Sequence, residues 1–165
     1  MLRYLLPLLL LAICACQPAT PRQEIDLTDR VVTTPEDGIG HYVYALSLPE
    51  RVAPGGTLDV QMDWRTVGPA DGRRRYAMEV LLDGPARKDY TIRENENTVG
   101  EINLINWFNH DFAVPANFPA GEYTVAVRLL DATNNNETVP LGFEPELALG
   151  DGFYRIATVA VAAEE

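Results

Sequence analysis

The chain has almost no cysteine, and the two residues that it contains, Cys14 and Cys16, lie within the first sixteen of its 165 residues. The remainder therefore holds neither a disulfide framework nor a metal site built from cysteine thiolates. Serine and lysine are equally scarce, with only Ser47 and Lys88. Nucleophilic catalysis needs an activated side chain beside a base, and Ser47 stands between two leucines rather than at an exposed turn. We expect a protein that is not an enzyme and that uses no cofactor.

The chain also lacks a hydrophobic run long enough to span a bilayer. The apolar stretch Leu5–Ile13 is shorter than the roughly 20 helical residues that about 30 Å of hydrocarbon requires. It follows Arg3, and a positive residue before a short apolar run is typical of a signal peptide. We expect this signal to occupy residues 1–15.

The end of that segment, Ile13–Cys16, resembles the lipobox of bacterial lipoproteins, in which a small residue precedes the cysteine that is acylated after cleavage. The resemblance implies that Cys16 is lipidated, and Cys14 is the poorer candidate because the bulky Ile13 precedes it. The same resemblance implies retention at the outer membrane, because the residue after the lipidated cysteine is Gln17 and not aspartate. Three acyl chains, at about 0.8 kcal/mol per buried CH₂, would hold the protein on a bilayer. An ordinary cleaved signal followed by a free or disulfide-paired cysteine is the alternative.

Basic residues are also few: the chain has 13 of them against 24 acidic residues, which gives a net charge of −11. Such a surface repels phosphate backbones and anionic lipid headgroups. We therefore expect no nucleic-acid partner, and a membrane contact that comes from the lipid.

The segment that follows the cysteine contains Pro18, Pro21 and Pro35 and has no sustained periodicity. We expect residues 16–38 to be the lipidated cysteine and a flexible tether, with a reach of a few tens of ångströms. A short strand at residues 30–33 that docks onto a sheet edge is left open.

From Gly40 onward, apolar and polar residues alternate as they do in half-buried strands. The clearest run is Leu58–Trp64, where Trp64 shares a face with Val60 and Met62 and is expected in the core. The expected strands lie at residues 42–48, 58–64, 76–82, 89–93, 100–108, 123–129 and 153–161. Seven to eight such strands, with no helical stripe, predict one antiparallel immunoglobulin-like β-sandwich over residues 39–165.

The stretch Phe118–Val127 resembles the tyrosine-corner entry of fibronectin type III domains and related sandwiches. The resemblance implies that the Tyr123 hydroxyl bonds back to upstream backbone. Together with Val52–Leu58 and Asp151–Ile156, this stretch is similar to immunoglobulin-like accessory modules of bacterial carbohydrate-active enzymes and to cell-surface adhesion sandwiches. The resemblance implies the fold, whereas function depends on the site.

Aromatic residues beside polar ones favour a carbohydrate site, because sugar rings stack on Trp and Tyr while amides and carboxylates bind the hydroxyls. Trp107 lies off the expected apolar face and is accompanied by Asn106, Asn109, His110 and Asp111. We take these five residues as the candidate ligand-binding site. The alternative is that Trp107 belongs to the rim of the core.

Two other clusters have both a plain and a functional explanation. Asp131, Asn134, Asn136 and Glu137 offer oxygen ligands for calcium, but the loop lacks the EF-hand pattern, and asparagine runs are common in turns. The basic run Arg73–Arg75 is either a solvated turn or a contact for an anionic glycan or a carboxylate-bearing partner. We expect no metal site elsewhere, since His41 and His110 are far apart in sequence.

The sequence thus favours a lipid-anchored recognition module of the bacterial envelope, with polysaccharide as the leading ligand. The first alternative is a structural lipoprotein, or one that binds another envelope protein through a sheet edge or an apolar patch. The second is a small hydrolase, which would need two facing carboxylates in a cleft.

Overall fold

The computed structural model describes residues 21–32, 40–67, 75–93 and 105–163. The expected signal peptide, Cys14, Cys16 and the first two arginines of Arg73–Arg75 lie outside the described residues. Within the described ranges, no helix has the length and the hydrophobicity needed to cross a bilayer.

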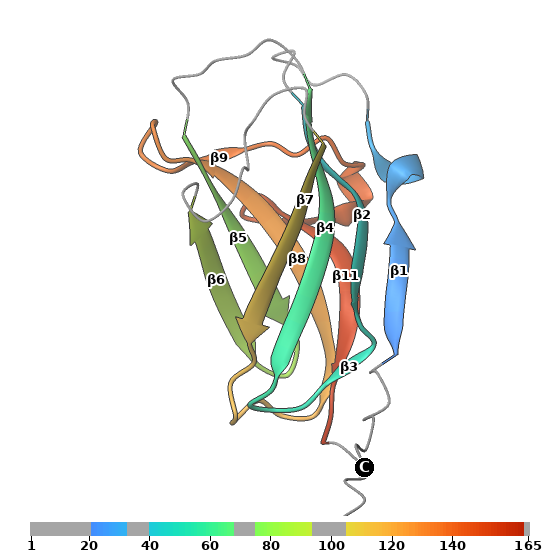
Figure 1. The fold of residues 1–165 in the computed structure, drawn as a ribbon. Coiled ribbons are helices and arrows are strands. Elements are labelled where there is room, and N and C mark those ends of the chain that lie inside the picture. Colours follow the sequence, from blue (N-terminus) through green and yellow to red (C-terminus); the bar gives the residue numbers. More distant parts are fainter. Residues whose placement is uncertain (1–20, 33–39, 68–74, 94–104, 164–165) are drawn as a thin grey trace, which may run out of the picture.

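Two β-sheets face one another, which confirms the expected all-β, sandwich-like fold (Figure 1). The smaller sheet is antiparallel and runs in the order β1 (Arg22–Asp26), β2 (Gly40–Pro49), β4 (Thr57–Val67), β7 (Ile105–Ala113). The larger sheet runs in the order β10 (Ala148–Gly150), β11 (Phe153–Val161), β8 (Gly121–Asp131), β5 (Tyr76–Asp83), β6 (Arg87–Arg93). In addition, β3 (Arg51–Val52) pairs with β11, and β9 (Glu137–Val139) pairs with β8. Two short 3₁₀ helices, at Thr28–Arg30 and Pro145–Leu147, complete the described elements.

The described strands number eleven, more than the seven or eight expected. The additional strands β1, β3, β9 and β10 are two to five residues long. Such lengths are too short to show an alternating pattern. The fifth expected strand, at residues 100–108, overlaps β7, which occupies Ile105–Ala113, whereas residues 100–104 lie outside the described residues. Its continuation past residue 108 buries Phe112, which the sequence analysis had not assigned to a strand.

Alternate side chains of the two sheets form one hydrophobic core. Val60, Met62 and Trp64 of β4 have no exposed surface, which confirms the expected core position of Trp64. They belong to the same cluster of buried side chains as Val80 of β5 and Val127 of β8. Full burial of each side chain of this size contributes about 1.5 to 3 kcal/mol relative to exposure.

The segment that we expected to be a tether is partly folded. Residues 22–26 form β1, which pairs antiparallel with β2 from Arg22↔Pro49 to Asp26↔Ala45. At residues 30–32, the described part of the strand left open at 30–33, no strand forms. Val31 instead makes an isolated bridge with Phe143, and Arg30 contacts Glu144 at 2.6 Å. The described part of the N-terminal segment is therefore an edge of the sandwich, and only residues 17–21 separate Cys16 from β1.

The expected tyrosine corner is confirmed. The Tyr123 hydroxyl donates a hydrogen bond to the carbonyl of Pro119 at 3.0 Å, and the Tyr123 ring stacks on Phe118 with a centroid distance of 5.1 Å. Tyr123 itself is fully buried. The contact ties the start of β8 to the loop that connects β7 with β8.

A second tyrosine links β6, an edge strand of the larger sheet, to β7, an edge strand of the smaller sheet. The Tyr90 hydroxyl, from β6, donates to the carbonyl of Ala113 in β7 at 2.7 Å, and its ring lies against Phe112. Burial raises the pKa of the Tyr90 phenol above its ordinary value. The folded protein therefore favours the neutral phenol.

Replacement of Tyr123 by phenylalanine removes the corner hydrogen bond and keeps the ring. We expect Tyr123→Phe to lower the free energy of unfolding by about 1 kcal/mol, measured by urea denaturation. Tyr154→Phe is the matched control, because the described contacts of half-buried Tyr154 are made by its ring. An equal loss in both variants would contradict the role assigned to the corner.

High pH should destabilise the protein through Tyr90. Its folded pKa lies above the unfolded value of about 10. Its contribution is therefore fully present below that pH and is lost as pH rises through the folded pKa. We expect the unfolding free energy of Tyr90→Phe to fall less between pH 9 and pH 11 than that of the unmodified protein. Equal slopes in the two proteins would refute this assignment.

Candidate functional site

The predicted ligand residues lie on β7, the edge strand of the smaller sheet. The register pairs Trp107 with Asp63 and Asn106 with Trp64 on β4, but the side chains of Trp107 and Asn106 are outside the described residues. Asn109 and Asp111 are exposed. The platform expected from Trp107 therefore stays a prediction.

His110 differs from its neighbours on β7. It is half-buried, and its ring lies 4.8 Å from that of Phe112, which belongs to the core. Asn109 and Asp111 are exposed and alternate with the inward-facing Phe112. The structure thus places His110 apart from the two polar residues with which we had grouped it.

The predicted calcium loop is the hairpin between β8 and β9. The Asp131 carboxylate accepts backbone N–H groups of Thr133 and Asn134 at 2.9 and 3.2 Å. The Asn134 amide donates to Glu137 at 2.5 Å, and Asn136 adopts a left-handed φ of 58°. These contacts explain the asparagine run as a tight turn. Among the described residues, no group of three or more His, Cys, Asp or Glu side chains has a metal-binding arrangement.

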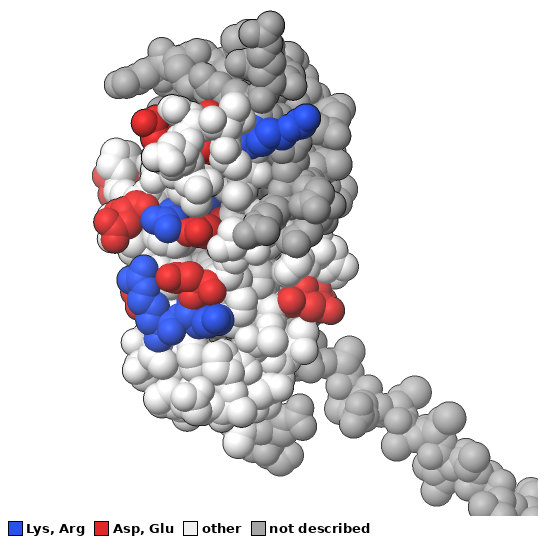
Figure 2. All heavy atoms as spheres, turned by 90° about the vertical axis from the view of Figure 1, so that its left-hand side faces the viewer, with Lys and Arg blue, Asp and Glu red and all other residues white. Residues whose placement is uncertain are grey.

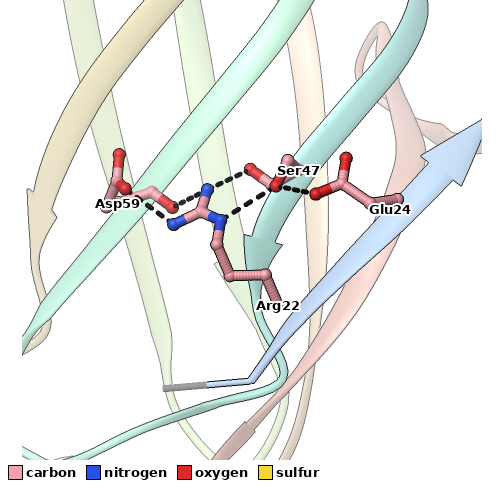
Figure 3. Close-up of polar contacts among 4 residues, drawn as sticks. All are labelled: Arg22, Glu24, Ser47 and Asp59. Carbon is pink, nitrogen blue, oxygen red and sulfur yellow. Dashed lines mark hydrogen bonds and ion pairs between the residues drawn. The ribbon is translucent and has the colours of Figure 1, made fainter. Parts of the chain in front are cut away.

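A polar cluster crosses the outer face of the smaller sheet (Figure 3). Arg22 of β1 donates to Ser47 Oγ on β2 at 2.9 Å and to Asp59 Oδ2 on β4 at 2.7 Å. The Ser47 hydroxyl in turn donates to Glu24 at 2.6 Å. One guanidinium therefore connects three neighbouring strands.

This cluster has the features of a structural clamp. The hydroxyl of Ser47 is bonded to a carboxylate and a guanidinium, and neither is the imidazole base that would activate a serine. The carboxylates of Glu24 and Asp59 are each engaged in these contacts. Because Arg22 is the first residue of β1, the clamp fixes the point where the chain enters the sandwich.

A hollow of about 770 Å³ lies on the outer face of the larger sheet. Its lining comes from β5, β6, β8, β9 and the hairpin between β8 and β9. The lining residues are Arg75, Tyr76, Ala77, Glu79, Thr91, Arg128, Leu130, Ala132, Asn136 and Thr138. Figure 2 shows the molecule from the side where β5, β6 and β9 lie, and charged side chains of both signs gather across the middle of this view.

Contacts on three sides hold Arg128 in this hollow. Its guanidinium bonds to Glu79 at 2.6 Å, donates to the carbonyl of Asp151 at 3.0 Å and lies 4.5 Å above the Phe153 ring. Glu79 is largely buried, with an exposed side-chain fraction of 15%. Arg128 is therefore a fixed donor rather than a freely moving surface charge.

Arg75 is the second cation of the hollow, and it is exposed. Its backbone N–H donates to the Thr133 hydroxyl at 2.7 Å, and its carbonyl accepts the N–H of Ala132. These bonds attach the start of β5 to the hairpin that follows β8. Arg75 is the one residue of the basic run Arg73–Arg75 that the structure describes.

Sequence analysis did not find this hollow. Its residues are separated by up to 63 positions, from Arg75 to Thr138. The sequence analysis had singled out two of its residues for other reasons, Arg75 as part of a basic run and Asn136 as a calcium candidate. Thr91, Thr138 and Glu79 look like ordinary outward residues of strands, and only the sheet order brings them together.

Removal of the clamp should loosen β1. We expect Arg22→Ala to lower the free energy of unfolding by about 1 to 2 kcal/mol, because it deletes partly exposed charge-assisted hydrogen bonds. We also expect faster amide hydrogen exchange in β1. Arg155→Ala, at an exposed position of β11, is the control. A loss no larger than that of the control would contradict the clamp.

Comparison with known proteins adds no family to these observations. No family model matches the chain, and no curated protein matches it.

Proposed function

We propose that this chain is a lipid-anchored, non-catalytic recognition module of the bacterial envelope, and that it binds carbohydrate in the hollow on the larger sheet. Cys16 carries the lipid, and the outer membrane is the site of retention. The domain has an immunoglobulin-like sandwich topology, a proposal supported by the tyrosine corner of Tyr123 and by the two facing sheets.

The observation that carries the proposal is the chemistry of the hollow. Its volume, about 770 Å³, lies within the range of about 300 to 1,000 Å³ that is typical of small-ligand sites. The hydroxyls of Thr91 and Thr138 and the amide of Asn136 are neutral groups that both donate and accept hydrogen bonds, as sugar hydroxyls require.

The charge of the hollow favours acidic sugars. Arg75 and Arg128 contribute two positive charges to the lining and Glu79 one negative charge, in a chain whose net charge is −11. A guanidinium binds a carboxylate through charge-assisted, bidentate hydrogen bonds. We therefore favour a polysaccharide that contains uronic acid.

A structural or protein-binding lipoprotein is the alternative function. Strand addition at β6 has little support, because exposed Arg87, Lys88 and Asp89 occupy this edge of the larger sheet. Charged edge strands resist pairing with another chain. Protein binding is accordingly an outcome of the test rather than the leading proposal.

Affinity electrophoresis of the full-length protein in a neutral detergent tests the proposal. The gels contain polygalacturonate or alginate, with neutral xylan and laminarin as comparisons. We expect retardation by the acidic polymers, and about tenfold weaker binding for Arg75→Glu because one charge-assisted contact becomes repulsive. Arg87→Glu makes the same charge change outside the hollow and should leave binding intact.

Trp107→Ala separates the two candidate surfaces. Retardation lost in Trp107→Ala but kept in Arg75→Glu would move the sugar site to β7. Retardation by none of the polymers would contradict carbohydrate binding and favour a protein partner.

A further inference from the structure

The end of the sandwich next to the N-terminal entry point differs in charge from the rest of the molecule. Three turns and the last described residues meet there: residues 53–56, 84–86, 115–120 and 162–163. Their sequences, Ala-Pro-Gly-Gly, Gly-Pro-Ala, Pro-Ala-Asn-Phe-Pro-Ala and Ala-Ala, contain no Asp, Glu, Lys or Arg. We call these four segments the uncharged cap. In the face that Figure 2 shows, the lower end of the molecule is correspondingly free of charged side chains among the described residues.

Backbone contacts place the cap segments together. Gly55 N–H donates to the carbonyl of Val114 at 3.1 Å, and Ala162 N–H donates to that of Val52 at 3.0 Å. Gly121, which follows the third turn, lies so close to Pro85 that a Cβ added to the glycine would stand 2.7 Å from the proline ring. Residues from four parts of the chain therefore form one surface.

The N-terminal entry point lies at this same end. The N–H of Glu50 donates to the carbonyl of Pro21 at 2.9 Å, and the next residue, Arg51, pairs with Ala160 of β11. Only five residues, 17–21, lie between Cys16 and Arg22, the first residue of β1. At no more than about 3.6 Å per residue, the six steps from Cys16 to Arg22 can span at most about 22 Å.

That reach is shorter than the domain. An eleven-residue strand such as β8 is about 36 Å long, at about 3.3 Å per residue. A lipid on Cys16 would therefore keep either the cap or the β1 side of the sandwich near the bilayer. The β1 side carries Arg22, Glu24, Asp26 and Asp29, whose hydration is costly to remove. The cap lacks that cost.

We propose that the uncharged cap rests against the headgroups of the bilayer that holds the lipid, so that the sandwich stands upright. This inference relies on the proposed lipidation of Cys16. Glu50 and Arg51, Asp83 and Arg87, and Glu122 flank the cap segments, and Glu164 and Glu165 follow Ala163 in sequence, so acidic residues outnumber basic ones around the cap. The surface therefore fits zwitterionic headgroups rather than anionic ones.

The upright orientation places the hollow away from the bilayer. Its lining lies at the start of β5 and at the end of β8, whereas the cap adjoins the end of β5 and the start of β8. The cap and the proposed sugar site are thus at opposite ends of these two strands.

Site-specific fluorescence in vesicles tests the orientation. The lipidated full-length protein is reconstituted in phosphatidylethanolamine and phosphatidylcholine with a headgroup-attached quencher lipid. A fluorophore is placed on a single introduced cysteine, in Ala116→Cys or Ala120→Cys at the cap, or in Ala132→Cys at the opposite end. All three alanines are exposed, so the chemical change is matched. We expect quenching at least about threefold stronger at the cap.

Two further variants complete the test. Asp29→Cys reports the β1 side, and quenching there equal to or above that at the cap would overturn the upright orientation, as would strong quenching at position 132. Ala116→Glu, combined with the label at Ala120→Cys, should reduce quenching, whereas Ala132→Glu should not. Unchanged quenching in Ala116→Glu would contradict the proposal that the cap rests against the headgroups because it lacks charge.

Mass spectrometry of the peptide that contains Cys16 distinguishes a missing lipid anchor from a wrong orientation. An unacylated cysteine would refute the anchoring part of the proposed function and this inference with it. An acylated protein with quenching on the β1 side would refute the orientation alone. Retardation by polysaccharide is measured independently of both.

Discussion

Burial of alternate side chains between two facing sheets is the constraint on which the other features of this protein depend. Val60, Met62 and Trp64 leave no surface exposed, and they share one core with side chains of β5 and β8. Because successive residues of a strand point to opposite faces, the same strands present polar residues outward. The polar side chains that a binding site would need therefore lie on the outer faces or at the two ends of the sandwich.

The two outer faces use charge differently. On the smaller sheet, Arg22 donates to both Ser47 and Asp59 where the chain enters the sandwich. On the larger sheet, Arg128 is also held by protein groups, but its neighbours surround a hollow of about 770 Å³. The first arrangement bonds its polar groups to one another except Asp59 Oδ1, which is buried without a hydrogen-bond partner among the described residues, and it holds β1 to the sheet. The second leaves an open hollow beside one guanidinium, that of Arg128, which is held in place by its neighbours.

The hollow and the cap lie at opposite ends of β5 and β8, so a surface that approached one of them would be far from the other. If Cys16 carries the proposed lipid, the five residues between it and β1 limit how far the domain can move from the anchor. The flexible tether expected from the sequence would have left the orientation free. Folding of residues 22–26 into the sheet would limit that freedom in the proposed lipidated protein, whose orientation would then depend on which surface loses least by approaching a bilayer.

Local pattern determined the long strands and the tyrosine corner, because alternation within Leu58–Trp64 and the spacing around Tyr123 are properties of neighbouring residues. The signal peptide expected from the apolar run before Cys16 is likewise inferred from sequence alone. Only tertiary structure decided that Arg22–Asp26 is a strand, since one apolar residue, Ile25, gives no period, and its pairing with β2 supplies the hydrogen bonds. The hollow depended on tertiary structure for the same reason: Arg75, Thr91 and Thr138 are distant in sequence and become neighbours through the order of β6, β5, β8 and β9.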